Sequence, residues 1–125
     1  MKVIIAGGRE IKRAKTFPEL LRLLANKEIF PENIELVTGC ARGVDQFPYY
    51  LKREVADFRQ TVITEFPADW DKYGRSAGHR RNKEMAEYSD VLILIWDGES
   101  RGSANMKLQM EKLKKPIYQL LVTKP

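Results

Sequence analysis

The sequence predicts an α/β domain in which a five-stranded, mostly parallel sheet carries helices on both faces. Five short β-type runs alternate with four helical patterns along the chain, as they do in chains of βα units. Four of the five runs are almost continuously apolar, which is typical of strands buried on both faces. The chain has 125 residues and no linker, repeat or low-complexity segment, so we predict a single domain over residues 1–125.

The predicted strands differ in how far they should be buried. The third, TVITEF, alternates apolar and polar residues, which indicates a less buried or edge strand. The other four read as strands buried on both faces. The five predicted strands cover residues 3–6, 34–37, 61–66, 91–95 and 117–122.

Helical patterns fill the intervals between the strands. Thr16 and Glu19 have the spacing of a capping box, which predicts a helix start ahead of the LLRLL run. The second predicted helix requires Pro48 in its first turn. The third and fourth are predicted at 79–88 and 104–114. The second helix places its apolar face on Val44, Phe47, Leu51, Val55 and Phe58.

Composition and charge limit the classes of function. The net charge of +5 favours anionic partners such as nucleotides or nucleic acid, without choosing among them. Cys40 is the only cysteine, so no intrachain disulfide can form, and a reducing, cytoplasmic setting fits best. With one histidine and one cysteine, we predict no metal site. The longest apolar run, at 91–96, is too short to span a membrane, and we expect no signal peptide at MKVIIAGG.

Glycine-bearing loops follow the first, second and fourth predicted strands. Each of the loops AGGRE, TGCARGVD and WDGESRGSANM also holds an arginine. Glycines allow backbone N–H groups to approach an anion, a following helix adds partial positive charge, and arginine can bind phosphate through two N–H groups. In parallel sheets ligands bind at the carboxyl ends of the strands, where these loops lie. We expect phosphate-binding residues at Gly7, Gly8, Arg9, Gly39, Arg42, Gly43, Arg101, Gly102 and Ser103.

Several other side chains in or near these loops have two interpretations each. Asp45 either caps the helix that it begins or binds a ribose hydroxyl. Trp70 and Tyr73, in the long loop after the third strand, either stack on a base or cover the edge of the sheet, with covering favoured. Met106 and Met110 are four residues apart and are interpreted as core.

The four loop motifs occur in the order AGGR, TGCARGVD, PADWDKYGRSAGHRRNKEM and WDGESRGSANM. In this order they resemble the SLOG superfamily, which includes the LOG phosphoribohydrolases and the Rossmann-like domain of DNA-processing protein A. The chain is most similar to the short, single-domain YspA-type branch, over nearly its whole length. The resemblance implies a three-layer Rossmann-like fold with strand order 3-2-1-4-5. It also implies a pocket that serves in sensing or processing nucleotides or nucleotide derivatives.

One position departs from the pattern of the LOG enzymes. Arg81, Asn82 and Met85 look like the motif of their third helix, an arginine-lysine pair followed by a methionine. Gly102 and Ser103 match a glycine-threonine pair after the fourth strand. Met106 stands where the resemblance places a catalytic glutamate. A thioether cannot polarise a ribose hydroxyl or stabilise an oxocarbenium-like centre as a carboxylate can. The methionine at this position therefore argues against LOG-type N-glycosidic cleavage. The carboxylates that could act by another route are Asp45, Glu84, Asp97 and Glu99.

Three functions are consistent with these observations, and they are given from the most to the least favoured. The first is binding of a nucleotide-type small molecule, with no cofactor beyond that ligand. The second is a phosphoribohydrolase or related N-glycosidase, with Asp45 and Glu84 as catalytic candidates. The third is a single-stranded nucleic-acid module, suggested by basic residues close to Trp70 and Tyr73. The basic and aromatic surface and the habits of the family are consistent with a homodimer. Beyond the turns, the expected ligand contacts are Asp45, Arg75, Arg81, Asn82, Glu84 and Asp97.

Overall fold

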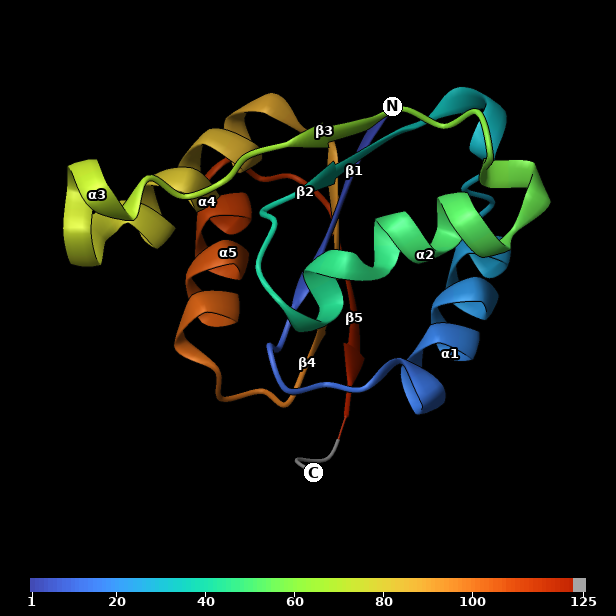
Figure 1. Cartoon of the computed structure of the whole chain (residues 1–125), viewed down its shortest axis with the longest axis horizontal. Helices are drawn as coiled ribbons and strands as arrows, with labels where there is room; N and C mark the ends of the chain where they lie inside the picture. The colour runs from blue at the N-terminus through green and yellow to red at the C-terminus, as the bar shows by residue number, and fades with distance from the viewer. Residues whose placement is uncertain (123–125) are drawn as a thin grey trace.

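The computed structural model is a three-layer α/β domain built on one parallel sheet, as predicted (Figure 1). It describes residues 1–122, so the last three residues of the predicted domain lie outside the described part. The strand order is β3-β2-β1-β4-β5, which confirms the predicted order. The strands are β1 (Lys2–Gly7), β2 (Glu35–Thr38), β3 (Ile63–Glu65), β4 (Val91–Trp96) and β5 (Ile117–Leu121).

The centre of the sheet is buried on both faces because its strands are apolar at every position. Val3 and Ile5 of β1 pack into one core, while Ile4 and Ala6 pack into the other. All six residues of β4 are buried in the same alternating way. The edge position predicted for the third strand is confirmed. The expectation that 117–122 is buried on both faces is wrong, because β5 forms the opposite edge and none of its residues is fully buried.

Two pairs of helices cover the two faces of the sheet. The first pair, α1 (Arg13–Asn26) and α2 (Phe47–Glu54), buries Phe17, Leu20 and Leu51 against one face. The second pair, α4 (Ala77–Tyr88) and α5 (Arg101–Lys112), buries Met85, Ala86, Met106 and Met110 against the other. The expectation that Met106 and Met110 belong to the core is confirmed.

Helix starts are the main errors of the sequence-based prediction. Thr16 does not cap α1, because the helix already begins at Arg13 and the Thr16 hydroxyl donates to the carbonyl oxygen of Lys12 at 2.9 Å. Threonine at such a position bonds backward within the helix instead of capping it. The fourth predicted helix begins at Arg101 and not at 104, which places Gly102 and Ser103 inside its first turn.

The predicted second helix is three shorter elements. A 3₁₀ helix, η2 (Gly43–Gln46), leads into α2, and a second one, η3 (Ala56–Phe58), follows it. Pro48 lies in the first turn of α2, as required. The helix breaks at Val55, which has extended backbone angles (φ −113°, ψ 110°), although Phe58 still reaches the core.

A short helix, α3 (Trp70–Tyr73), occupies part of the predicted long loop. It lies beside α4 at one end of the molecule, away from the sheet (Figure 1). The favoured expectation that Trp70 and Tyr73 cover the edge of the sheet is therefore wrong. Their exposed fractions are 51% and 37%.

The carboxyl end of α4 is held by a lysine from the segment between α5 and β5. The Lys115 ammonium donates to the carbonyl oxygens of Ala86 and Ser89 at 2.7 Å and of Glu87 at 3.2 Å. A cation at this position binds open carbonyl groups and complements the helix dipole. Within residues 1–122, no helix is long and apolar enough to cross a membrane.

Candidate functional site

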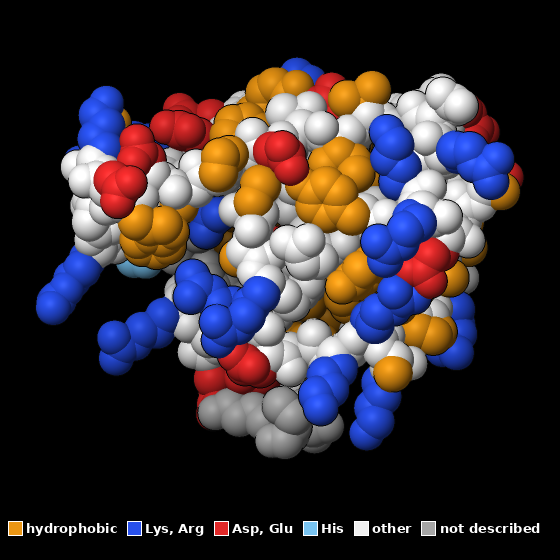
Figure 2. All heavy atoms as spheres, viewed as in Figure 1, with side chains coloured by type: hydrophobic (Ala, Val, Ile, Leu, Met, Phe, Trp, Pro, Cys, Tyr) orange, Lys and Arg blue, Asp and Glu red, His pale blue; other side chains and the backbone are white. Residues whose placement is uncertain are grey.

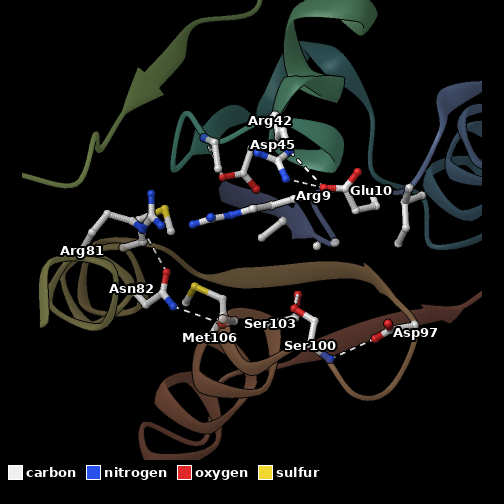
Figure 3. A pocket seen from close by; sticks show the side chains of 17 residues that line it. Arg9, Glu10, Arg42, Asp45, Arg81, Asn82, Asp97, Ser100, Ser103 and Met106 are labelled. Atoms are coloured by element: carbon white, nitrogen blue, oxygen red, sulfur yellow. Dashed lines mark hydrogen bonds and ion pairs between the residues drawn. The ribbon is translucent and has the colours of Figure 1, made fainter. Parts of the chain in front are cut away.

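The cavity that brings together most of the predicted residues lies at the carboxyl edge of the sheet, between the loops that follow β1 and β4. The strand order reverses between these two strands, and such reversals are where open α/β sheets bind ligands. The cavity has a volume of about 480 Å³ and is lined by the loops after β1, β2 and β4 together with α4 and α5 (Figure 3). Lysine and arginine side chains gather over the loops after β1 and β2 on the face shown in Figure 2.

Glycines let the loops approach closely at two points. A Cβ on Gly39 would stand 2.5 Å from Nη1 of Arg81, so the arginine side chain occupies that space. Gly43 has a φ of +80°, and a Cβ there would stand 2.3 Å from the carbonyl oxygen of Gly8. A side chain at Gly43 would push the two loops apart, and one at Gly39 would displace the Arg81 guanidinium. These glycines therefore allow the walls of the site to meet.

The amide of Gly8 does not have the role that we expected. It donates to the carbonyl oxygen of Ile95 at 3.1 Å, which extends the pairing of β1 with β4. An N–H already bonded in this way cannot also bind a phosphate with good geometry. The prediction that the Gly8 amide binds an anion is therefore wrong, although Gly7 and Gly8 both line the cavity.

The TGCARGVD turn after β2 is held by its own side chains. The Thr38 hydroxyl donates to the carbonyl oxygen of Asp45 at 2.6 Å, and Oδ2 of Asp45 accepts the amide of Ala41 at 3.1 Å. The Gln46 side chain donates to the carbonyl oxygen of Ala41 at 2.7 Å. The Asp45 carboxylate thus bonds to its own turn and does not cap η2, while it also faces the cavity.

The Asp45 carboxyl has a raised pKa of about 6, because burial disfavours its charged form. Its exposed fraction is 6%. The amide of Ala41 and the charges of Arg81 and Arg9 act in the opposite direction but do not cancel the effect. Burial also lowers the pKa of the Arg81 guanidinium. The wall of the site thus contains a carboxylate that takes up a proton close to neutral pH.

Hydrogen bonds from Arg81 and Asn82 connect three walls of the cavity. Nη1 of Arg81 donates to the carbonyl oxygen of Gly39, and its Nε donates to Oδ1 of Asn82 at 3.0 Å. The Asn82 amide then donates to the carbonyl oxygen of Gly102 at 3.2 Å and to Oδ1 of Asn105 at 3.1 Å. This network joins the β2 turn to α4 and α4 to the start of α5.

Two further arginines reach the cavity from the loops. Arg42 forms an ion pair with Glu10 at the exposed rim. Within the described residues 1–122, the Arg9 side chain makes no hydrogen bond or ion pair. Figure 3 shows Arg9 extended across the cavity toward Arg81. The cavity therefore presents a guanidinium group that no carboxylate neutralises by direct pairing.

The first turn of α5 lies opposite these arginines. Its first intrahelical hydrogen bond runs from the amide of Ala104 to the carbonyl oxygen of Ser100 at 2.9 Å. The amides of residues 101–103 precede that bond and are open to a ligand, and the helix dipole adds partial positive charge there. Ser100 and Ser103 face the cavity, where their hydroxyls lie 3.4 Å apart. Helix starts of this kind bind phosphate and other anions.

Most of the predicted contact residues meet at this cavity. Gly39 lines a neighbouring cavity, and Gly43 a third one. Arg75, Glu84 and Arg101 are exposed and line none of these three cavities. The predicted residues that line the cavity are Gly7, Gly8, Arg9, Arg42, Asp45, Arg81, Asn82, Asp97, Gly102 and Ser103.

The sequence analysis overlooked several residues of the site. Glu10 follows Arg9 directly, so its place in the loop could have identified it. Ile11 and Ser100 carry no motif that distinguishes them from core or turn residues, and only the folded chain brings them to the cavity. Met85 belongs to the motif of the third helix but was not predicted to contact a ligand. Met106 lines the cavity although its exposed fraction is 1%.

Comparisons with known proteins do not assign the site. No protein-family model matches the chain, and no curated protein matches its sequence. Among residues 1–122, no group of three or more His, Cys, Asp and Glu side chains could hold a metal ion.

Two glycine substitutions test the loop packing. We expect Gly43→Ala to lower the free energy of unfolding by about 1–3 kcal/mol, because its methyl group overlaps the backbone of Gly8 and Arg9 and its φ of +80° strains a residue with a side chain. Gly102→Ala is the matched control, since nothing lies within 4 Å of its new Cβ. In the first turn of α5 it should be neutral or stabilise by up to about 1 kcal/mol. Urea unfolding measures both, and equal effects would contradict the packing described.

The raised pKa of Asp45 predicts a pH dependence of stability. Its folded pKa of about 6 lies above the value of 3.8 for a free aspartate, so the folded state binds the proton more tightly. The stabilisation from this group is therefore fully present below about pH 4 and is lost as pH rises through 6. Relative to Asp45→Asn, the wild-type free energy of unfolding should fall by about 2 kcal/mol between pH 4 and pH 7. A constant difference between the two proteins would contradict the assignment.

Proposed function

We propose that the chain binds a nucleotide or nucleotide derivative, with a phosphate group held between Arg9 and the first turn of α5. The observation that carries the proposal is the pairing of these two features across one cavity. Arg9 has no hydrogen bond or ion pair within the described chain, and the open amides of α5 lie opposite. Both favour an anion, and charge-assisted hydrogen bonds of this kind are the stronger ones in proteins.

The remaining walls support a nucleotide better than a free anion. Ile11 provides a partly exposed apolar side chain in the same cavity as the arginines, and the nearly buried Met85 and Met106 close its floor. A volume of about 480 Å³ falls in the range of small-molecule sites, which combine apolar walls with a few polar groups. An inorganic phosphate would leave this apolar surface empty, whereas the ring of a nucleotide would cover it. The motif resemblance to the SLOG superfamily supports the same ligand class.

Binding is favoured over N-glycosidic hydrolysis because the carboxylates at the cavity already have partners. Asp45 bonds to the amide of Ala41. Asp97 accepts the amides of Glu99 at 2.8 Å and Ser100 at 2.9 Å, and Glu10 pairs with Arg42. A hydrolase needs a carboxylate directed at the sugar. Nucleic-acid binding has weaker support. Of the basic residues close to Trp70 and Tyr73, Arg81 lines two of the cavities, whereas those outside the cavities described are Arg75, His79, Arg80 and Lys83.

Substitution of Arg9 tests the proposal. We expect Arg9→Met to weaken ADP binding by at least about tenfold, because hydrogen bonds to charged groups contribute about 1.5–3 kcal/mol. Arg9 has no hydrogen bond or ion pair in the described chain. The free energy of unfolding of the Arg9→Met protein without ligand should therefore equal that of the wild type. Isothermal titration calorimetry measures the affinity, and thermal unfolding measures the stability.

Arg22→Met is the matched control, since it removes the same charge from an exposed position on α1. It should leave ADP affinity within about twofold of wild type, because an exposed charge remote from the ligand is screened by salt. Equal losses in the two variants would indicate a general charge effect and contradict a phosphate contact at Arg9. Absence of wild-type binding to AMP, ADP and ADP-ribose would reject the proposed function.

A further inference from the structure

We propose that the site has a second subsite, at Trp70, for a second aromatic ring of the same ligand. The ligand would be a dinucleotide in which a diphosphate joins two ring-bearing nucleosides. This inference rests on the proposed nucleotide-binding function and deepens it. It comes from a neighbouring cavity of about 360 Å³, which Trp70 and Pro67 line on one side.

The two cavities share their charged wall. Arg9, Ala41, Arg42 and Arg81 line both of them. An anionic group near these arginines therefore has open space on two sides. One side leads to the floor at Met85 and Met106, and the other leads to Trp70. A diphosphate between the two cavities would direct one nucleoside into each.

Trp70 presents a free ring surface to the second cavity. Its exposed fraction is 51%, and within residues 1–122 it makes no contact with another aromatic ring or with a cation. Tyr73 in the same short helix differs, because Lys72 and Arg80 both lie over its ring. An uncovered indole is a good stacking surface for a nucleic-acid base. Trp70 is thus the ring of α3 that is available to a ligand.

The Trp70 ring is held next to the charged wall. Cη2 of Trp70 and Nη2 of Arg81 lie 3.4 Å and 3.9 Å from the point where a Cβ on Gly78 would stand. A Cβ there would make only ordinary van der Waals contact with them, so both side chains lie against the first turn of α4. At the start of α3, the Asp69 carboxylate accepts the amide of Lys72 at 3.1 Å and caps the helix. The subsite is therefore positioned by the fold before any ligand binds.

Two ligands that differ only by the second ring test the inference. ADP-ribose carries one base on a diphosphate bridge with a second ribose, and diadenosine diphosphate carries the second base as well. We expect diadenosine diphosphate to bind about tenfold more tightly to the wild-type protein, as expected for one base stacked on an aromatic side chain. Trp70→Ala should remove this preference without changing ADP-ribose affinity, and Trp70→Phe should retain most of it.

Phe30→Ala is the control, since it deletes an aromatic ring of similar exposure, 49%, and should preserve the preference. Tryptophan fluorescence gives a second readout. The chain has two tryptophans, and Trp96 is buried, so quenching by diadenosine diphosphate should come from Trp70 and be absent in Trp70→Phe. Thermal unfolding of each variant separates loss of the ring from loss of the fold.

Four outcomes would overturn the inference. Equal wild-type affinities for the two ligands would remove the second subsite while leaving nucleotide binding intact. Equal weakening of both ligands by Trp70→Ala would show that the ring supports the site as a whole. Tighter binding of a single-stranded tetranucleotide than of diadenosine diphosphate would assign the groove to nucleic acid. Failure of both ligands to bind would reject the proposed function itself.

Discussion

The position of the Arg81 guanidinium against the backbone of Gly39 is the constraint on which the site depends. The side chain occupies the space that a Cβ on Gly39 would need, and it donates to the Gly39 carbonyl oxygen. Through Asn82 the same contact continues to the start of α5. The β2 turn, α4 and the start of α5 are therefore joined by one hydrogen-bond network. A change at Gly39 would disturb the charged wall and the helix start opposite it together.

The cavity holds a buried carboxylate and more than one guanidinium group. Asp45 and Arg81 both lose hydration, and burial disfavours the charged form of each. Their mutual attraction offsets part of that cost, but Arg9 adds a positive charge that no carboxylate pairs with directly. An anion bound here would face two guanidinium groups and an open helix start. Because the cavity removes these groups partly from water, each such interaction is stronger than on the surface.

The sequence was sufficient for the architecture and for the position of the cavity that most of the predicted residues line. Continuous apolar runs determined the central strands, and glycine-bearing loops after β1, β2 and β4 identified the carboxyl edge. Errors arose where local patterns compete with tertiary contacts. The amide of Gly8 bonds to β4, which no local motif reveals. The first turn of α5 begins at Arg101, and the open ring of Trp70 depends on how α3 packs beside α4. A cavity whose walls come from segments far apart in the sequence cannot be predicted from the pattern of any one segment.

The central claim is that a phosphate group binds between Arg9 and the start of α5. The most direct measurement is the change in backbone amide NMR shifts of ¹⁵N-labelled protein as AMP is added. Our account predicts the largest saturable changes at Gly102 and Ser103, whose amides are open. The amide of Gly8, which is bonded to Ile95, should change little and serves as an internal reference. Saturable changes confined to amides outside the cavity, or none at all, would contradict the account.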